Sequence, residues 1–457
     1  MGQRQLSLST EKQKVRTMSY VRKMMYLLPV LLASVVLFVC SSPVSSAAGP
    51  YDTIGSGDIW VVVASVLVFL MIPGLAIFYG GLLRKESMIS ILVQTTIVVI
   101  LSGVVWIVCG YSLAFSGGEG GVIGNLDYFF LDSLVDDMAA GWGTDSLLFA
   151  VFQMKFVLIT AAIIIGACAE RIRFKTIAVL AVLWPLLVYV PACHCIWGGG
   201  YLAANFTIVD YAGGTVVHTL AGMSGLALAV FAGLRATKIR DSQPHNVPFV
   251  YLGVFLLWVG WYGFNGGSGL GTGGTIVRSI VTTTASAVGA TLVWMAAEYY
   301  FKKQITVIGV GTGILAGLVF ITPMAAYVSV SSSFAVGIIG GTICYIFSHL
   351  IHVTLKNRID DALDVFVVHG VGGIFGTILT AFLVQAQYGS PVDGILFGGP
   401  VDVLIGNCIA IALCAVLAFI VTYAVIFIGN KLLPGKLTEE EIEEGQDLVE
   451  HHEDAYN

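Results

Sequence analysis

Long apolar runs separated by short polar loops fill the chain between residues 59 and 430. Eleven of these runs are long enough to cross a bilayer, since a membrane-spanning helix needs about 20 mostly apolar residues. They cover residues 59–80, 88–115, 147–169, 175–196, 212–233, 247–265, 277–300, 305–323, 334–355, 364–386 and 402–430. The pattern predicts an all-α polytopic membrane protein with eleven transmembrane helices in the lipid bilayer of the cell membrane.

The start of the chain follows a different pattern. Basic residues precede an apolar run at 27–40, and a run of about 14 residues is too short to span a bilayer comfortably. Small residues come next, and Ser46-Ala47-Ala48 is typical of a cleavage site. We expect residues 1–48 to be a signal peptide with a basic n-region that is removed, and the alternative is an uncleaved first helix.

The basic residues of the loops lie almost entirely on one side of the predicted bundle. Alternate loops contain Arg84, Lys85, Arg171, Arg173, Lys175, Arg235, Lys238, Arg240, Lys302, Lys303, Lys356, Arg358, Lys431 and Lys436. The opposite loops contain only Arg278. Because basic loops stay in the cytoplasm, the mature N-terminus is expected outside and the C-terminus inside. We call the cytoplasmic side the inner face.

Composition supports a membrane protein and excludes other classes. Charged residues are 11% of the chain, against about 25% in ordinary soluble domains. A net charge of −6 argues against a nucleic-acid partner. The cysteines show no paired metal spacing, and we expect the Cys193-His194-Cys195 segment to serve helix packing rather than a metal. The sequence contains no nucleotide-binding loop or metalloprotease motif, so neither a cofactor nor an enzymatic activity is expected.

Two histidines lie inside predicted spans, where ionisable groups are costly and often functional. His218 and His369 each follow Val-Val, with an aspartate upstream (Asp210 and Asp364) and a glycine-rich stretch downstream. The two spans are five apart, which predicts two inverted five-helix repeats plus a final helix, with a path at their interface. A paired imidazole path relays hydrogen bonds and protons. The alternative is that each histidine simply bonds a neighbouring helix.

Both aspartates are suited to capping the start of a helix, and Asp210 also adds negative potential for a cation. Aromatic residues gather at the outer ends of spans: Phe152, Phe156, Trp197, Trp261 and Phe264. They form either an interfacial belt or an aromatic cage for a small cation, and composition does not separate the two. The hydroxyl of Ser268 would complete such a cage.

Several strings together resemble the ammonium transporter family (Amt/MEP/Rh), specifically its Amt branch. They are Pro73-Gly-Leu-Ala-Ile-Phe-Tyr-Gly-Gly81, Gly166-Ala-Cys-Ala-Glu170-Arg-Ile-Arg-Phe174, Trp197-Gly-Gly-Gly200, Asp210-Tyr-Ala-Gly-Gly-Thr-Val-Val-His218, Gly260-Trp-Tyr-Gly-Phe-Asn-Gly-Gly-Ser268 and Asp364-Val-Phe-Val-Val-His369-Gly. The resemblance extends over residues 51–457, with a transmembrane domain at 51–430. It implies a homotrimer with one pore in each subunit.

The resemblance also implies a role for each candidate residue. Trp197, Phe156 and Ser268 would form the outer ammonium site, Asp210 would lie near it, Phe152 and Phe264 would gate the pore, and His218 and His369 would line it. The protein would recruit NH4+, deprotonate it and pass NH3, with the proton relayed separately. The alternative function is an ammonium sensor of the same fold with little or no flux.

Two features qualify this resemblance. Lys155 lies between the two phenylalanines of its span, where the family commonly has a small residue, and we expect it to point away from the pore. Residues 431–457 form an acidic cytoplasmic tail with nine carboxylates between Glu439 and Asp454. Composition favours a solvated tail, whereas the resemblance implies that it docks a PII-type signalling protein.

Overall fold

The computed structural model describes residues 56–134, 144, 146–240, 242–271, 273–355, 358–432 and 434–456. Within these residues, eleven helical segments are long and apolar enough to cross a membrane, which confirms the eleven predicted spans. The predicted signal peptide, residues 1–48, lies outside the described residues.

The first five spans form one half of the bundle. Span one is α2 (Ser56–Leu82), and span two joins η1 (Lys85–Ser87), α3 (Met88–Val105), η2 (Trp106–Gly110) and α4 (Tyr111–Phe115). Span three joins α5 (Leu147–Ile164) and η5 (Ile165–Cys168), and span four joins α6 (Phe174–Trp184), η6 (Pro185–Tyr189), α7 (Val190–Trp197) and α8 (Tyr201–Asn205). Span five joins η7 (Gly214–Thr219) and α9 (Leu220–Ala232).

The next five spans and the last one follow. They are α11 (Val247–Gly267), α12 (Gly273–Lys302), α13 (Val307–Ile321) with η8 (Thr322–Met324), α14 (Val330–His349) with η9 (Leu350–Thr354), η10 (Phe366–Val371) with α15 (Gly372–Leu383), and α16 (Asp402–Leu432). Short helices outside the spans are η3 (Phe129–Leu131), α10 (Thr237–Arg240), η11 (Ala386–Tyr388), η12 (Ile395–Phe397), α17 (Glu439–Glu444) and η13 (Asp447–His451).

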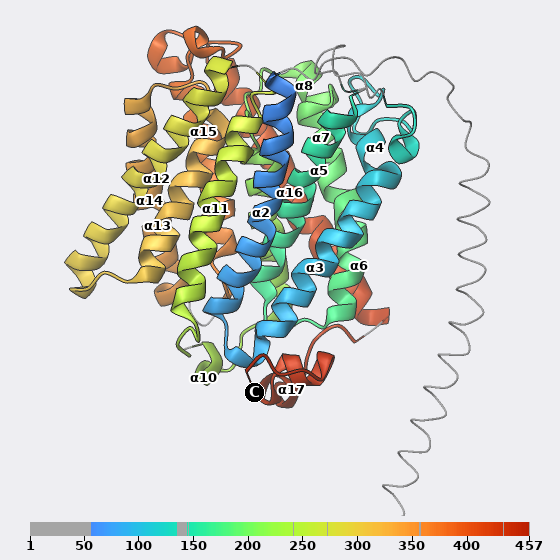
Figure 1. Cartoon of the computed structure of the whole chain (residues 1–457), viewed down its shortest axis with the longest axis vertical. Helices are drawn as coiled ribbons and strands as arrows, with labels where there is room; N and C mark the ends of the chain where they lie inside the picture. The colour runs from blue at the N-terminus through green and yellow to red at the C-terminus, as the bar shows by residue number, and fades with distance from the viewer. Residues whose placement is uncertain are drawn as a thin grey trace, which may run out of the picture. The chain divides into compact units, whose positions relative to one another are not determined.

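Glycines allow spans that are distant in sequence to pack backbone to backbone. The first and sixth spans, α2 and α11, lie side by side (Figure 1). A Cβ atom added to Gly253 of α11 would lie 2.6 Å from the carbonyl oxygen of Gly74 in α2. Small residues favour this close approach in membranes, where apolar side chains alone provide little drive for helices to associate.

The acidic tail packs against the inner face and is not a solvated end. The Asp447 carboxylate accepts the N–H groups of Ile89 and Ser90 at the start of α3. The Glu450 carboxylate accepts the N–H of Phe174 at the start of α6. Both carboxylates therefore cap helices whose first N–H groups lack partners within the helix. Figure 1 shows the tail helix α17 below α3 and α6.

Candidate functional site

The two histidines predicted to form a pair are in direct contact. The Nδ1 atoms of His218 and His369 are 3.1 Å apart, and the rings stack with their centroids at 5.2 Å. His218 is 1% exposed and His369 is 7% exposed. One Nδ1 must carry the proton that the other accepts, so the two rings adopt complementary tautomers. The Nε2 atom of His218 is buried and has no hydrogen-bond partner among the described residues.

Glycines four residues after each histidine bring the pair together. A Cβ atom on Gly222 would collide with the backbone of Gly370, directly after His369. In return, a Cβ atom on Gly373 would lie 2.7 Å from the backbone nitrogen of Thr219, directly after His218. These reciprocal contacts explain the glycine-rich stretch that follows each histidine and match the predicted repeat.

Each histidine lies on a π-helical turn at the start of its span, η7 or η10. Such turns are rare and are often found at functional sites. The turn of His218 begins at Gly214, four residues after Asp210, whose carboxylate accepts the N–H groups of Gly213, Gly214, Thr215 and Val216 at 2.6–3.1 Å. Burial raises the pKa of Asp210, and these four bonds act in the opposite direction. The predicted capping role of Asp210 agrees with this geometry.

The prediction that Asp364 caps the other turn is wrong. Asp361 does so, because its Oδ2 atom accepts the N–H of Phe366 at 2.7 Å. Asp361 precedes His369 by eight residues, as Asp210 precedes His218. Asp364 instead occupies the position equivalent to Gly213, and both have positive φ values, 55° at Asp364 and 111° at Gly213. The Asp364 carboxylate pairs with His352 at 2.7 Å. An aspartate tolerates this left-handed conformation better than most residues.

Aromatic rings connect His218 to a cavity on the outer side. The ring centroids of Trp197 and Phe156 are 6.1 Å apart, those of Phe156 and Phe264 are 4.5 Å apart, and those of Phe264 and His218 are 5.8 Å apart. The rings of Phe156 and Phe264 are at most 1% exposed. The Phe152 ring contacts Phe156 at a centroid distance of 5.0 Å, and unlike Phe156 it does not line the outer cavity. The path between the cavity and the histidines is therefore closed by aromatic side chains.

The outer cavity has a volume of about 290 Å³ and combines aromatic with polar side chains. Trp197, Phe156, Asp210 and Ser268 all line it. The indole N–H of Trp197 donates to the backbone oxygen of Asp210 at 2.9 Å, which fixes the ring over the cavity. The hydroxyl of Ser268 donates to the Phe264 carbonyl at 2.8 Å, so its lone pairs stay available as acceptors. The Oε1 atom of Gln153, also in this lining, has no partner among the described residues.

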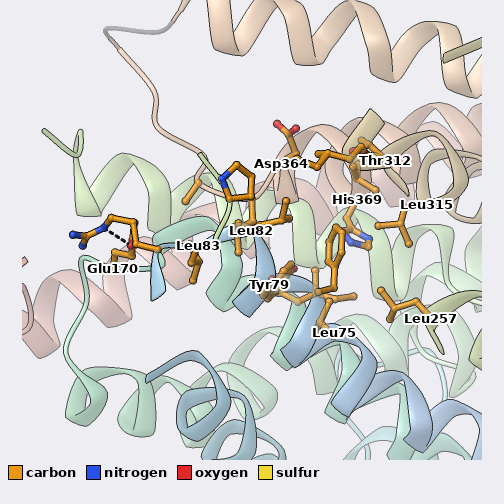
Figure 2. Close-up of a pocket in the computed structure, with 18 of the residues that line it drawn as sticks. Leu75, Tyr79, Leu82, Leu83, Glu170, Leu257, Thr312, Leu315, Asp364 and His369 are labelled. Atoms are coloured by element: carbon orange, nitrogen blue, oxygen red, sulfur yellow. Dashed lines mark hydrogen bonds and ion pairs between the residues drawn. The ribbon is translucent and has the colours of Figure 1, made fainter. Parts of the chain in front are cut away.

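A second cavity, of about 210 Å³, lies on the inner side of the histidines. Figure 2 shows the His369 ring among Leu75, Leu257 and Leu315, which line this cavity. The twin histidines thus separate a partly polar outer cavity from an inner cavity that is apolar next to His369.

Buried ion pairs join the inner loops around the second cavity. Glu170 accepts from Arg84 and Arg235 at 2.9 Å each, and Asp360 accepts from Arg235 at 2.9 Å and lies 3.6 Å from Arg171. Burial alone would raise the pKa of Asp360, but hydrogen bonds and charge from Arg235, with the charge of Arg171, lower it to about 2. Arg84 also donates to the Ile442 carbonyl, which ties the tail to this network.

Two residues singled out in the sequence lie away from the path. The ammonium group of Lys155 lies over the ring of Phe69 in α2, 5.3 Å from its centroid, in agreement with an outward direction. His194 contacts the carbonyl oxygens of Ala114 and Gly118 at 3.0 and 3.1 Å, and so connects α7 to the outer loop.

Comparison with known proteins decides the family. Residues 59–456 match the family model described as Ammonium Transporter Family. The chain belongs to the ammonium transporter family. An ammonium transporter of Bacillus subtilis is 39% identical, over 88% of this chain and 98% of its own. Ammonium transporter Amt1 of Archaeoglobus fulgidus is 35% identical, over 87% of this chain and 98% of its own.

Solved structures support the same assignment. A structure named Sensor Amt Protein matches with a TM-score of 0.78 at 31% identity, covering 86% of this chain and 98% of that chain. Mep2 of Saccharomyces cerevisiae matches with a TM-score of 0.76 at 30% identity, covering 86% and 92%. The predicted family and fold class are confirmed. The chain is a multi-pass ammonium transporter of the cell membrane and not an enzyme.

Proposed function

We propose that this transporter takes NH4+ into the outer cavity, removes a proton, and passes NH3 and the proton separately toward the inner cavity. The observation that carries the proposal is the hydrogen-bonded pair of His218 and His369, placed between two cavities and closed off by aromatic rings on the outer side. Each feature has a chemical role in separating ammonium from other small cations.

The outer cavity suits a small cation that can donate hydrogen bonds. The faces of Trp197 and Phe156 attract a cation through their quadrupoles. The lone pairs of Ser268 accept from an N–H group, and potassium has no such group to donate. The Asp210 carboxylate, held by four N–H groups and 8% exposed, adds negative potential without binding the ion directly. These contacts replace part of the water that ammonium loses.

The ring pair of Phe156 and Phe264 excludes intact ions. Moving an unpaired ion into such an apolar region costs many kcal/mol, whereas neutral ammonia pays a much smaller penalty. Ammonium passes this barrier after losing its proton, and potassium cannot do so. We assign the constriction to Phe156 and Phe264 because these rings contact each other and bridge Trp197 and His218, whereas Phe152 contacts Phe156 but does not line the outer cavity.

Beyond the rings, the imidazole pair provides the hydrogen-bonding groups that an apolar pore otherwise lacks. The free Nε2 of His218 is placed to meet ammonia or a proton, and the Nδ1–Nδ1 contact continues the path to His369. Transfer of a proton along this contact exchanges the tautomers of the two rings. We propose net transport of charge, with ammonia and the proton both reaching the inner side.

The test is current across proteoliposomes that contain the full-length protein. Equal inward gradients of ammonium and potassium are applied in separate runs. A current with ammonium and none with potassium supports the proposal. The alternative function, an ammonium sensor, is suggested by the likeness to the structure named Sensor Amt Protein. Saturable ammonium binding without current or ammonia uptake would favour the sensor.

We also propose that the protein acts as a homotrimer and that residues 1–48 are a cleaved signal peptide.

We further propose that the tail binds a PII-type protein. Exposed acidic residues of the tail, such as Glu440 and Glu444, offer a partner hydrogen-bond acceptors and negative charge. Deleting 438–457 touches no span, so assembly of the bundle should persist. We expect the deletion to change flux and abolish inhibition by the organism's own PII-type protein. Equal binding and inhibition in both chains would rule out this docking role.

A further inference from the structure

The second five-helix repeat contains a buried carboxyl group, Asp361, of which only one oxygen is hydrogen-bonded. Asp361 is 1% exposed, and its Oδ2 atom accepts the N–H of Phe366 at the start of η10. Its Oδ1 atom is also buried and has no hydrogen-bond partner among the described residues. Asp210, at the equivalent place in the first five-helix repeat, accepts four N–H groups. At the same position, the carboxylate therefore has hydrogen bonds to both oxygens in one repeat and to only one oxygen in the other.

The titratable groups around Asp361 do not neutralise it. Those that interact with it are Asp364 of its own loop, His352 of η9, Cys168 of η5, Arg171 after η5 and Tyr79 of α2. His352 is paired with Asp364 at 2.7 Å. Arg171 lies 3.6 Å from Asp360, the residue before Asp361, and donates to the carbonyls of Gly233 and Ala167.

The two protonation states of Asp361 are therefore close in free energy near neutral pH. Burial, and then the negative charge of Asp364, raises the pKa of Asp361 to about 7, although N–H groups at the start of η10 act to lower it. The ionised form accepts a stronger hydrogen bond from Phe366 and is favoured at the start of a helix. The protonated form avoids placing an unpaired charge in the interior.

We propose that Asp361 is a positioning residue for His369 that exchanges one proton with cytoplasmic water, so that inner pH sets how firmly the inner histidine is held. The proton leaves Oδ1 as hydroxonium, and no other covalent bond changes. Ala362, Leu363 and Asp364, which follow Asp361 directly, line the inner cavity. The consequence for flux rests on the proposed function, in which His369 takes part in conduction.

The direction of the effect follows from the contact with Phe366. Above neutral pH, ionised Asp361 anchors the first turn of η10 and His369 with it. Below neutral pH, the protonated carboxyl is a weaker acceptor and the turn is held less firmly. At fixed outer pH, we expect a loss of current on inner acidification of roughly five- to tenfold, which corresponds to the difference of about 1–1.4 kcal/mol between a hydrogen bond to a charged group and one to a neutral group.

Two spectroscopic measurements on full-length protein test the proposal without relying on flux. Infrared spectra should show the C=O stretch of a protonated carboxyl below pH 7 that disappears toward pH 8. The band should be absent in Asp361→Asn. In Asp364→Asn it should persist, with its midpoint lowered by on the order of one pH unit because a negative neighbour is lost. With histidine labelled by 15N, the His369 signal should shift with the same midpoint in wild type and stay constant in Asp361→Asn.

Transport adds a third readout. Current is measured with outer pH fixed and inner pH varied between 6 and 8, for wild type, Asp361→Asn and Asp361→Glu. Inner pH also changes the ammonium gradient, and this part of the response is the same in all three proteins. We expect the remaining response to be absent in Asp361→Asn and present again in Asp361→Glu. A wild-type protein without current would refute the proposed function, while the spectra would still decide the protonation and positioning of Asp361.

Three results would overturn the proposal. They are a wild-type spectrum without the carboxyl band at low pH, a His369 signal that ignores pH, and a pH response that survives in Asp361→Asn but is lost in Asp364→Asn. The last result would assign the response to the pair of Asp364 and His352. If Asp361→Asn does not fold, the midpoint shift in Asp364→Asn still supports or refutes the assignment.

Discussion

Asp210 and Asp361 each precede a pore histidine by eight residues, but their surroundings differ. Asp210 accepts four N–H groups, whereas Asp361 has one bonded oxygen and one buried oxygen without a partner. A loop with Gly213 and Gly214 can wrap its N–H groups around a carboxylate, whereas the equivalent loop has Asp364 and Val365. Two repeats with the same backbone turn before the histidine therefore bind the start of that turn with different numbers of hydrogen bonds.

The largest expected effect comes from removing both histidines. The double variant His218→Leu with His369→Leu removes the imidazole nitrogens that provide hydrogen bonds beyond the aromatic constriction. We expect ammonium-driven current to be lost or replaced by an unselective leak. The measurement is current with ammonium and with potassium in proteoliposomes, after correct folding of the variant is checked. Wild-type current and selectivity in the folded double variant would refute a proton relay through the two histidines.

The second prediction compares the aspartates directly. Asp210→Ala leaves four N–H groups without acceptors and should lower the stability of the bundle by about 2–4 kcal/mol. Asp361→Ala removes one hydrogen bond and also a poorly solvated carboxyl, so its cost should be about 1 kcal/mol or less. Denaturation of both variants in detergent checks this. Equal losses of stability would show that the two carboxylates do not differ in how much their hydrogen bonds stabilise the bundle.

The third prediction sharpens the position of the constriction. Phe156→Ala opens the ring contact with Phe264 and should let water and potassium through. Phe152→Ala is the matched control on the same helix face, and it should disturb potassium exclusion much less because this ring contacts Phe156 but does not line the outer cavity. Potassium current distinguishes them. A larger leak through the Phe152 variant would place the constriction at Phe152 instead.

The smallest of these effects is expected at the outer cavity. Trp197→Leu removes a cation–π contact of roughly 0.5–2 kcal/mol, which corresponds to a few-fold to about thirtyfold loss of apparent ammonium affinity. The concentration dependence of the current measures it. An unchanged concentration dependence in a folded variant would indicate that Trp197 belongs to the interfacial aromatic belt and does not bind ammonium.

Much of the fold could be predicted because its signal lies in long stretches of sequence. The eleven spans follow from apolar length, and the pairing of His218 with His369 follows from two similar strings five spans apart. The glycines after the histidines were visible as a pattern, but their reciprocal contacts require the structure.

Single residues in loops were harder to interpret. Asp364 is the aspartate that the sequence pattern points to, because it stands directly before Val-Phe-Val-Val-His369, and a turn with a left-handed residue at Asp364 is not visible in sequence. The eight-residue spacing from Asp210 to His218, applied to His369, would have identified Asp361. The loop arginines indicated orientation but not the network of Arg84 and Arg235 with Glu170. Composition alone favours a solvated tail, because it does not reveal that Asp447 and Glu450 cap two helices.

In the proposed mechanism, ammonium crosses as ammonia and a proton, and the twin histidines relay the proton. The most direct measurement is the solvent isotope effect on ammonium current in proteoliposomes, comparing H2O with D2O at equal gradients. A relay that breaks and forms N–H bonds predicts a current in D2O that falls by more than the ratio of the two solvent viscosities. A current that falls only by the viscosity ratio would indicate passage of intact ammonium and would contradict the account.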